Sequence, residues 1–142
     1  MEKQKYGHLV KRHPIVQLPH PTDENGEDYK SIEIVGNKDF NSDFSMVCLP
    51  IIEPVLLEAG PPHRHDHDIY LTFMGLGQNC LEDLGAELVI HFGEEQEAHV
   101  ITSPSSIYIP KGLLHCPLEF TRVDKPMLLI LSTLASEYEK KD

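Results

Sequence analysis

Hydrophobic residues along most of this chain recur at every second position. The alternation defines five segments: Ile32 and Ile34; Met46 and Cys48; Leu88, Ile90 and Phe92; Ile107 and Ile109; and Leu128, Ile130 and Leu134. Side chains two residues apart lie on the same face of a β-strand, so this spacing predicts strands. Helical spacing is weak and confined to the tail from Leu134 to Lys140. The pattern predicts an all-β chain.

Short runs of turn-forming residues separate these segments. They are Gly36-Asn37-Lys38-Asp39, Gly93-Glu94-Glu95, Ser103-Pro104-Ser105 and Pro110-Lys111-Gly112. Short strands punctuated in this way are typical of a β-sandwich or β-barrel.

The first thirty residues have a different character. Prolines occupy positions 14, 19 and 21, and a polar stretch follows from Thr22 to Asp28. Proline lacks the N–H that a central strand needs, so these positions favour extended edge structure. We expect residues 1–30 to form an arm that packs on the barrel or on a second subunit.

Length and charge narrow the possibilities further. A chain of 142 residues suits one domain, here taken as residues 1–142. Twelve Lys and Arg against twenty-three Asp and Glu give a formal net charge of −11. Such a surface repels phosphate backbones and anionic lipids, so neither nucleic acid nor a membrane is an expected partner.

The cysteines and the N-terminus indicate a cytoplasmic protein. Cys48, Cys80 and Cys116 are an odd number without a C-x-x-C pair, which does not build a disulfide framework. The first residues are polar and lack the apolar stretch of a signal peptide, and the run Met127 to Leu131 is too short to cross a bilayer.

The most informative segment for chemistry is Pro62-His63-Arg64-His65-Asp66-His67-Asp68. In an extended strand His63 and His65 project from one face and can direct their imidazoles to one point. A third histidine from another strand would complete a three-nitrogen metal site with open coordination positions.

The segment Pro110-x-Gly112-x-x-His115 supplies that third histidine, and together the two segments resemble the paired motifs of the cupin superfamily. The resemblance covers roughly residues 44 to 134. It implies a cupin-type jelly-roll β-barrel with an extended N-terminal arm, and a metal held by His63, His65 and His115.

The chain departs from the family at the glutamate that follows H-x-H. That residue is expected at position 69 or 70, where this chain has Ile69 and Tyr70. Asp68 would reproduce the family's spacing to Gly75, and Tyr70 its spacing to Gly77. Asp68 can bind a metal as an anion more readily than Tyr70. The phenol of Tyr70, with an ordinary pKa near 10, must first lose its proton under the influence of the ion. We therefore expect Asp68 as a fourth ligand, with His67, Tyr70 or only water as alternatives.

The resemblance implies one divalent transition metal ion per chain, namely Zn, Fe, Mn or Ni. A divalent ion on three neutral imidazoles can polarise a carbonyl or activate dioxygen. We expect a small metal-dependent enzyme, of oxygenase, isomerase or decarboxylase type, acting on a small organic molecule in the barrel pocket. The alternative is a non-catalytic cupin that binds or senses a small molecule. Cupin barrels commonly pair, so a homodimer is also expected.

Two further residues near the motifs have simpler roles. Cys116 follows His115 directly and points to the opposite face if the strand is regular, where it is a packing residue. Tyr108, between Ile107 and Ile109, either caps the pocket or faces solvent.

Overall fold

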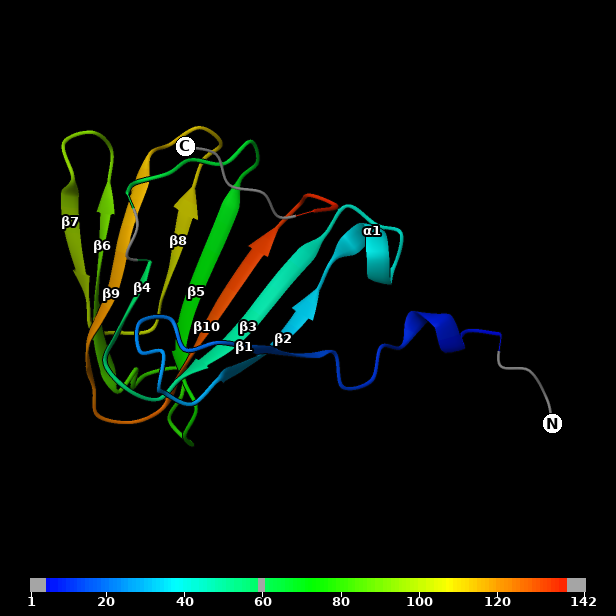
Figure 1. The fold of residues 1–142 in the computed structure, drawn as a ribbon, viewed down its shortest axis with the longest axis horizontal. Coiled ribbons are helices and arrows are strands. Elements are labelled where there is room, and N and C mark those ends of the chain that lie inside the picture. Colours follow the sequence, from blue (N-terminus) through cyan, green and yellow to red (C-terminus); the bar gives the residue numbers. More distant parts are fainter. Residues whose placement is uncertain (1–4, 59–60, 138–142) are drawn as a thin grey trace.

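The structure, a computed structural model, describes residues 5–58 and 61–137. Within these residues ten strands form two antiparallel sheets, accompanied by a 3₁₀ turn η1 (Gly7–Leu9) and one short helix α1 (Gly36–Asp39). Figure 1 shows the two sheets side by side, with the N-terminal segment extending away from them. The all-β prediction is confirmed.

The six-stranded sheet has the order β1-β2-β3-β10-β5-β8, and the four-stranded sheet has the order β4-β9-β6-β7. The first sheet comprises β1 (Ile15–Leu18), β2 (Tyr29–Ile34), β3 (Ser45–Ile51), β5 (Ile69–Gly75), β8 (Ser105–Ile109) and β10 (Met127–Thr133). The second comprises β4 (Val55–Glu58), β6 (Ala86–Phe92), β7 (Glu97–Ile101) and β9 (His115–Val123). Strands β3 to β10 divide between the sheets as in a jelly roll, and β1 and β2 extend one edge.

The hydrophobic core consists of buried side chains contributed by both sheets. Phe73 on β5 and Phe120 on β9 are fully buried and meet edge to face, with ring centroids 6.2 Å apart. Aliphatic side chains from both sheets surround this pair, including Leu49, Ile51, Leu71, Leu88, Ile90, Ile109, Leu118, Met127 and Leu129. Burial of these side chains holds the barrel together.

The six-stranded sheet is apolar on both faces. In β6 of the four-stranded sheet, the alternating residues Leu88 and Ile90 face the core. In β2, β3 and β10, by contrast, Ile32, Cys48 and Ile130 form a directly paired row on the outer face. The core positions of β2 are Tyr29 and Ser31, so the hydrophobic alternation in that strand indicates its exposed side.

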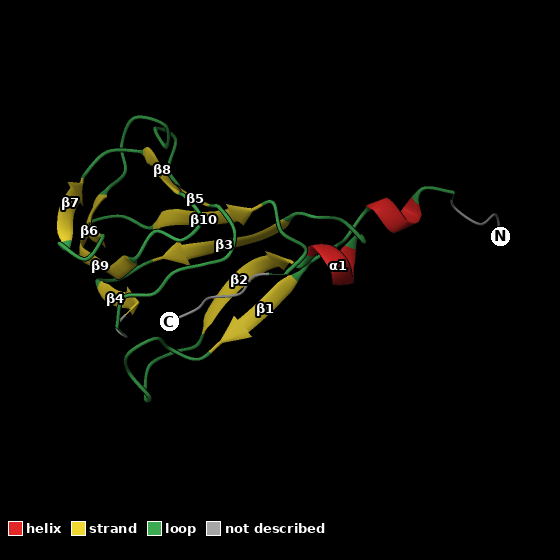
Figure 2. Ribbon diagram, turned by 90° about the horizontal axis from the view of Figure 1, so that it is seen from above, coloured by secondary structure: helices red, strands yellow, loops and turns green. Residues whose placement is uncertain are grey.

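The first thirty residues contain a strand, β1, as well as an extended segment. Pro14 and Pro19 bracket β1, which pairs only with β2 at the edge of the sheet, as expected for a strand flanked by prolines. Residues 5–13 are all exposed and lead away from the sheets in both views (Figures 1 and 2).

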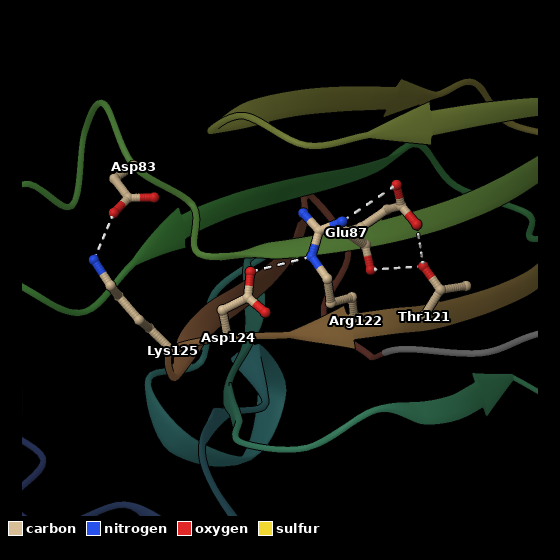
Figure 3. A network of polar contacts seen from close by, with 6 residues as sticks. All are labelled: Asp83, Glu87, Thr121, Arg122, Asp124 and Lys125. Atoms are coloured by element: carbon tan, nitrogen blue, oxygen red, sulfur yellow. Dashed lines mark hydrogen bonds and ion pairs between the residues drawn. The ribbon is translucent and has the colours of Figure 1, made fainter.

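Exposed ion pairs fasten the turn after β9 to the segment before β6 (Figure 3). Lys125 Nζ lies 2.9 Å from Asp83 Oδ2, and Arg122 Nε lies 3.1 Å from Asp124 Oδ2. The hydrogen bond between Lys125 and Asp83 is the main cause of two pKa shifts. It lowers the pKa of Asp83 and raises the pKa of Lys125. These contacts lie on the surface, outside the barrel interior.

Within the described residues, no helix has the length and apolar character needed to cross a bilayer.

Candidate metal centre

Backbone pairing brings the two histidine segments together. His63 and His115 form an isolated antiparallel bridge, in which each backbone N–H donates to the other residue's carbonyl oxygen at 3.0 Å. Gly112 N–H also donates to the His65 carbonyl at 3.0 Å. Directly paired residues project to the same side, so the bridge sets the His63 and His115 side chains next to each other.

The three predicted histidines converge inside the barrel. The ring centroids of His63 and His115 lie 4.6 Å apart, those of His63 and His65 5.0 Å, and those of His65 and His115 5.1 Å. All three are at most 5% exposed. The three rings are therefore neighbours, and a shared metal ion requires in addition that one nitrogen of each points to a common centre.

The orientation of His115 is fixed by a hydrogen bond. Its Nδ1 lies 2.9 Å from the carbonyl oxygen of Leu113, and a carbonyl only accepts, so Nδ1 carries the hydrogen. The other nitrogen, Nε2, then has the lone pair needed for a metal. Metal-binding histidines characteristically donate their second N–H to such an acceptor.

The histidines line a small cavity between the sheets. Its volume is about 50 Å³, and it is bounded by His63, His65, His115, Cys116 and aliphatic side chains. The aliphatic residues are Leu57, Ile69, Leu71, Ile90, Ile109, Leu118, Leu129 and Leu131. The cavity has room for an ion with a few waters or with one compact ligand.

The structure brings Cys116 into this cavity, so the expectation that it points away from the histidines is wrong. Pairing of β6 with β9 shifts between Ile90↔Leu118 and Phe92↔His115, leaving one extra residue in β9. Cys116 has φ of 86° at this bulge, and His115 and Cys116 are both buried. A β-bulge ends the regular alternation of a strand and redirects a side chain.

As a result, Cys116 joins two of the histidines as a candidate ligand. Among the described residues, one potential ligand atom each of His63, His115 and Cys116 lie within 4.8 Å of one another, and His65 is not part of this group. Pro117 gave a sequence signal for this, because a proline inside a strand favours a bulge or an edge.

Asp68 is half-buried and is not among the residues that line the cavity. Its Oδ1 accepts the backbone N–H of Lys111 at 2.8 Å. Partial desolvation and a hydrogen bond to the Asp68 carboxylate raise the pKa of Tyr108. Asp68 is not in the three-residue group of Cys116, and its role as fourth ligand stays a prediction.

The alternative fourth ligands are also placed. His67 Nδ1 lies 2.9 Å from the hydroxyl of Thr133, which itself donates to the Asp68 carbonyl. The His67 ring stacks on that of His65 at 5.5 Å. Tyr70 lies on the outer face of β5, where its ring stacks on Tyr108 at 5.3 Å. Tyr108 is 53% exposed and therefore faces solvent.

Comparisons by sequence find no matching family model and no matching curated protein. By structure, the chain is similar to iron(II) HppE, with a TM-score of 0.53 and 14% identity over 84% of this chain and 55% of HppE. It is also similar to Bacillus subtilis oxalate decarboxylase, a protein with Mn(II) centres, with a TM-score of 0.57 and 9% identity over 88% of this chain and 28% of the decarboxylase.

A cupin 2 conserved barrel domain protein from Rhodopseudomonas palustris matches with a TM-score of 0.52 and 12% identity, over 89% of this chain and 76% of that protein. The chain thus spans about half the length of HppE and less than a third of the decarboxylase. At such identities the likeness shows the fold. The chain has the cupin fold, and the predicted jelly-roll barrel and cupin resemblance are confirmed.

Proposed function

We propose that this protein binds one divalent transition metal ion in the barrel cavity through His63, His65 and His115. The observation that carries the proposal is the convergence of these three buried rings, with centroids 4.6 to 5.1 Å apart. The hydrogen bond from His115 Nδ1 to Leu113, which leaves Nε2 for the ion, supports it. Asp68 stays the sequence-based candidate for the fourth ligand, a position that only one group would fill.

The proposed activity is that of a small metal-dependent enzyme, of oxygenase, isomerase or decarboxylase type. A divalent ion held by neutral imidazoles would supply a Lewis acid or a site for dioxygen. The residues of the chain would fix the ion and keep bulk water out with aliphatic side chains. A cavity of about 50 Å³ favours a compact organic substrate. The fold neighbours include one protein with iron(II) and one with Mn(II), and the choice among Zn, Fe, Mn and Ni depends on the ligands that this chain supplies.

A second function, non-catalytic binding or sensing of a small molecule, has its own supporting observation. Apart from the three histidines and Cys116, the residues that line the cavity are aliphatic. Proton-transfer catalysis needs a titratable group near the substrate, and this lining supplies few. A compound that binds the metal-loaded protein and is recovered unchanged would favour this second function.

Metal analysis tests the site directly. We expect purified or reconstituted protein to contain about one transition metal ion per chain, the number one three-histidine site accepts. Replacing His63, His65 and His115 together by alanine should abolish the bound metal. The matched control replaces three exposed histidines, His8, His13 and His99, by alanine and should keep it.

Two results would contradict the proposal. Wild-type protein that takes up none of the four metals on reconstitution is no metalloprotein. Full occupancy in the triple site variant, with far-ultraviolet circular dichroism unchanged, would mean that other residues bind the ion.

We also propose a single cupin domain that forms a homodimer in the cytoplasm. Cys48 and Cys80, which form no disulfide among the described residues, are consistent with a reducing compartment. The apolar outer face of the six-stranded sheet supports a second copy as the partner, because sheets with two apolar faces are normally covered on both.

A further inference from the structure

We propose that the Cys116 thiolate is a metal ligand, completing a site of three nitrogens and one sulfur with His63, His65 and His115 in place of the missing cupin glutamate. The inference rests on the proposed metal site and adds a ligand that the sequence had assigned to packing. Cys116 Sγ lies within 4.8 Å of the candidate ligand atoms of His63 and His115.

Local backbone geometry explains why sulfur reaches the cavity. In a regular β9 strand Cys116 would face away from His115. The extra residue in β9 opposite the Ile90–Phe92 segment and the positive φ of Cys116 end that alternation. His115 is 3% and Cys116 is 4% exposed, so two consecutive residues enter the same interior.

Packing alone explains why Cys116 is buried, but it does not explain why the sulfur lies beside two histidine side chains. Small apolar residues pack a core as well as cysteine does, and the rest of this cavity is lined by leucine and isoleucine. Sulfur here lies instead against two imidazoles, the partners with which it shares zinc and iron sites in proteins.

The charge of the bound ion favours a thiolate ligand. Three imidazoles leave a divalent ion with its full charge in an aliphatic cavity, where an uncompensated charge is costly. Binding of the ion to Cys116 forms a metal–sulfur bond and releases the thiol proton to solvent, which lowers the net charge of the site by one. The family's glutamate would make the same correction.

The ligand set also predicts metal preference. Thiolate is a soft ligand that suits zinc and other thiophilic ions, whereas manganese prefers carboxylate and water. Three nitrogens and one sulfur suit a four-coordinate ion. We therefore expect Cys116 to favour Zn(II), Co(II) or Fe(II) over Mn(II).

Absorption spectroscopy of the Co(II)-loaded full-length protein provides the test. Tetrahedral Co(II) has visible d–d bands, and a thiolate ligand adds a sulfur-to-metal charge-transfer band in the near ultraviolet. Wild type should show both. Cys116→Ser should retain visible bands and lose the charge-transfer band, and its Zn(II) affinity should fall by more than about tenfold, since even outer-sphere partners have effects of that size.

Cys48→Ser is the matched control, because Cys48 lies on the outer face of β3. It should keep the charge-transfer band. Cys116→Ala, measured in parallel, excludes weak ligation by the serine hydroxyl. Visible bands without a charge-transfer band in wild type would overturn the thiolate ligand while leaving the histidine site standing. Absence of every Co(II) band, with no uptake of the metal, would overturn the metal site itself.

Discussion

Gly75, the last residue of β5, has no room for a side chain. A Cβ placed there would clash with the backbone oxygen of Asp83, whereas one at Gly77 would meet nothing within 4 Å. Of the two glycines whose spacing could complete the first cupin motif, only Gly75 is therefore required sterically. Counting back from Gly75 assigns the family's acidic position to Asp68.

Alanine substitutions at these two glycines should give different results. We expect Gly75→Ala to lower the free energy of unfolding by about 1–3 kcal/mol, the range for overpacking against atoms that cannot move aside. Gly77→Ala should change it by less than about 0.5 kcal/mol, as for ordinary surface sites. Urea denaturation followed by circular dichroism measures both. Equal effects of the two substitutions would contradict the steric assignment.

The candidate site shows what residue-level reasoning from sequence can reach. His63, His65 and His115 could be predicted to lie together because an H-x-H pair and a P-x-G-x-x-H segment have distinctive spacing. Cys116 could not, because parity along a strand assumes regular pairing and β9 is bulged at that residue. His67 shares the parity of His63 and His65, yet the chain turns there and Thr133 engages its Nδ1.

At the scale of elements, Glu53 links the β1–β2 loop to the segment that follows β3. The backbone N–H groups of Thr22 and Asp23 donate to His20 Nδ1, so His20 Nε2 carries the hydrogen and donates to Glu53 Oε1 at 2.5 Å. The Tyr29 hydroxyl donates to the same oxygen at 3.1 Å. Burial and this contact raise the pKa of Tyr29 to about 12.

This link should contribute to acid sensitivity. Hydrogen bonds from His20 and then Tyr29 lower the pKa of Glu53 below its usual 4.5, against smaller opposing effects of desolvation and of Asp23. A carboxyl whose pKa is lower in the folded state stabilises the protein above its unfolded pKa. That contribution is lost as the pH falls through the folded value, so it should disappear below about pH 4.5.

Glu53→Gln removes the charge and should flatten this part of the pH dependence. We expect it to lower stability at neutral pH by less than about 1 kcal/mol, because Glu53 is partly exposed and solvent screens the interaction. Urea midpoints at neutral and acidic pH measure the effect. Glu119→Gln, on the exposed side of β9, should leave the slope unchanged. A slope in Glu53→Gln that matches wild type would exclude Glu53 as a source of acid sensitivity.

Element identity was easier to predict than element orientation. The spacing of Leu88 and Ile90 indicated both a strand and its buried face. Ile32 and Cys48 indicated strands too, but they lie on the outer face of a sheet whose inner face is held by residues such as Tyr29 and Leu49. Periodicity of two identifies a strand without saying which face is covered, and a sheet with two apolar faces supplies two such patterns.

At the scale of the whole molecule, apolar side chains are exposed at several places, and two of these bear on a partner surface. The outer face of the six-stranded sheet carries a groove of about 220 Å³ lined by Ile15, Ile32, Cys48, Pro50 and Leu128, with Lys30 and Ser31 beside it. The N-terminal segment exposes Tyr6, Leu9 and Val10 by 55 to 63% and extends away from both sheets (Figure 1). We propose this face as the interface of the proposed homodimer, in which a second copy would cover the groove.

A charge introduced into this face should separate the dimer. Ile32 is 42% exposed, so Ile32→Lys should fold normally as a single chain. Burying its ammonium group between two copies would cost several kcal/mol, which corresponds to association weaker by more than about a hundredfold. Val100→Lys is the matched control, because Val100 is 61% exposed on β7 of the other sheet. Sedimentation velocity at micromolar concentration should show dimers for wild type and Val100→Lys, and monomers for Ile32→Lys. A monomeric wild type would contradict the homodimer, whereas dissociation by Val100→Lys alone would move the interface to the four-stranded sheet.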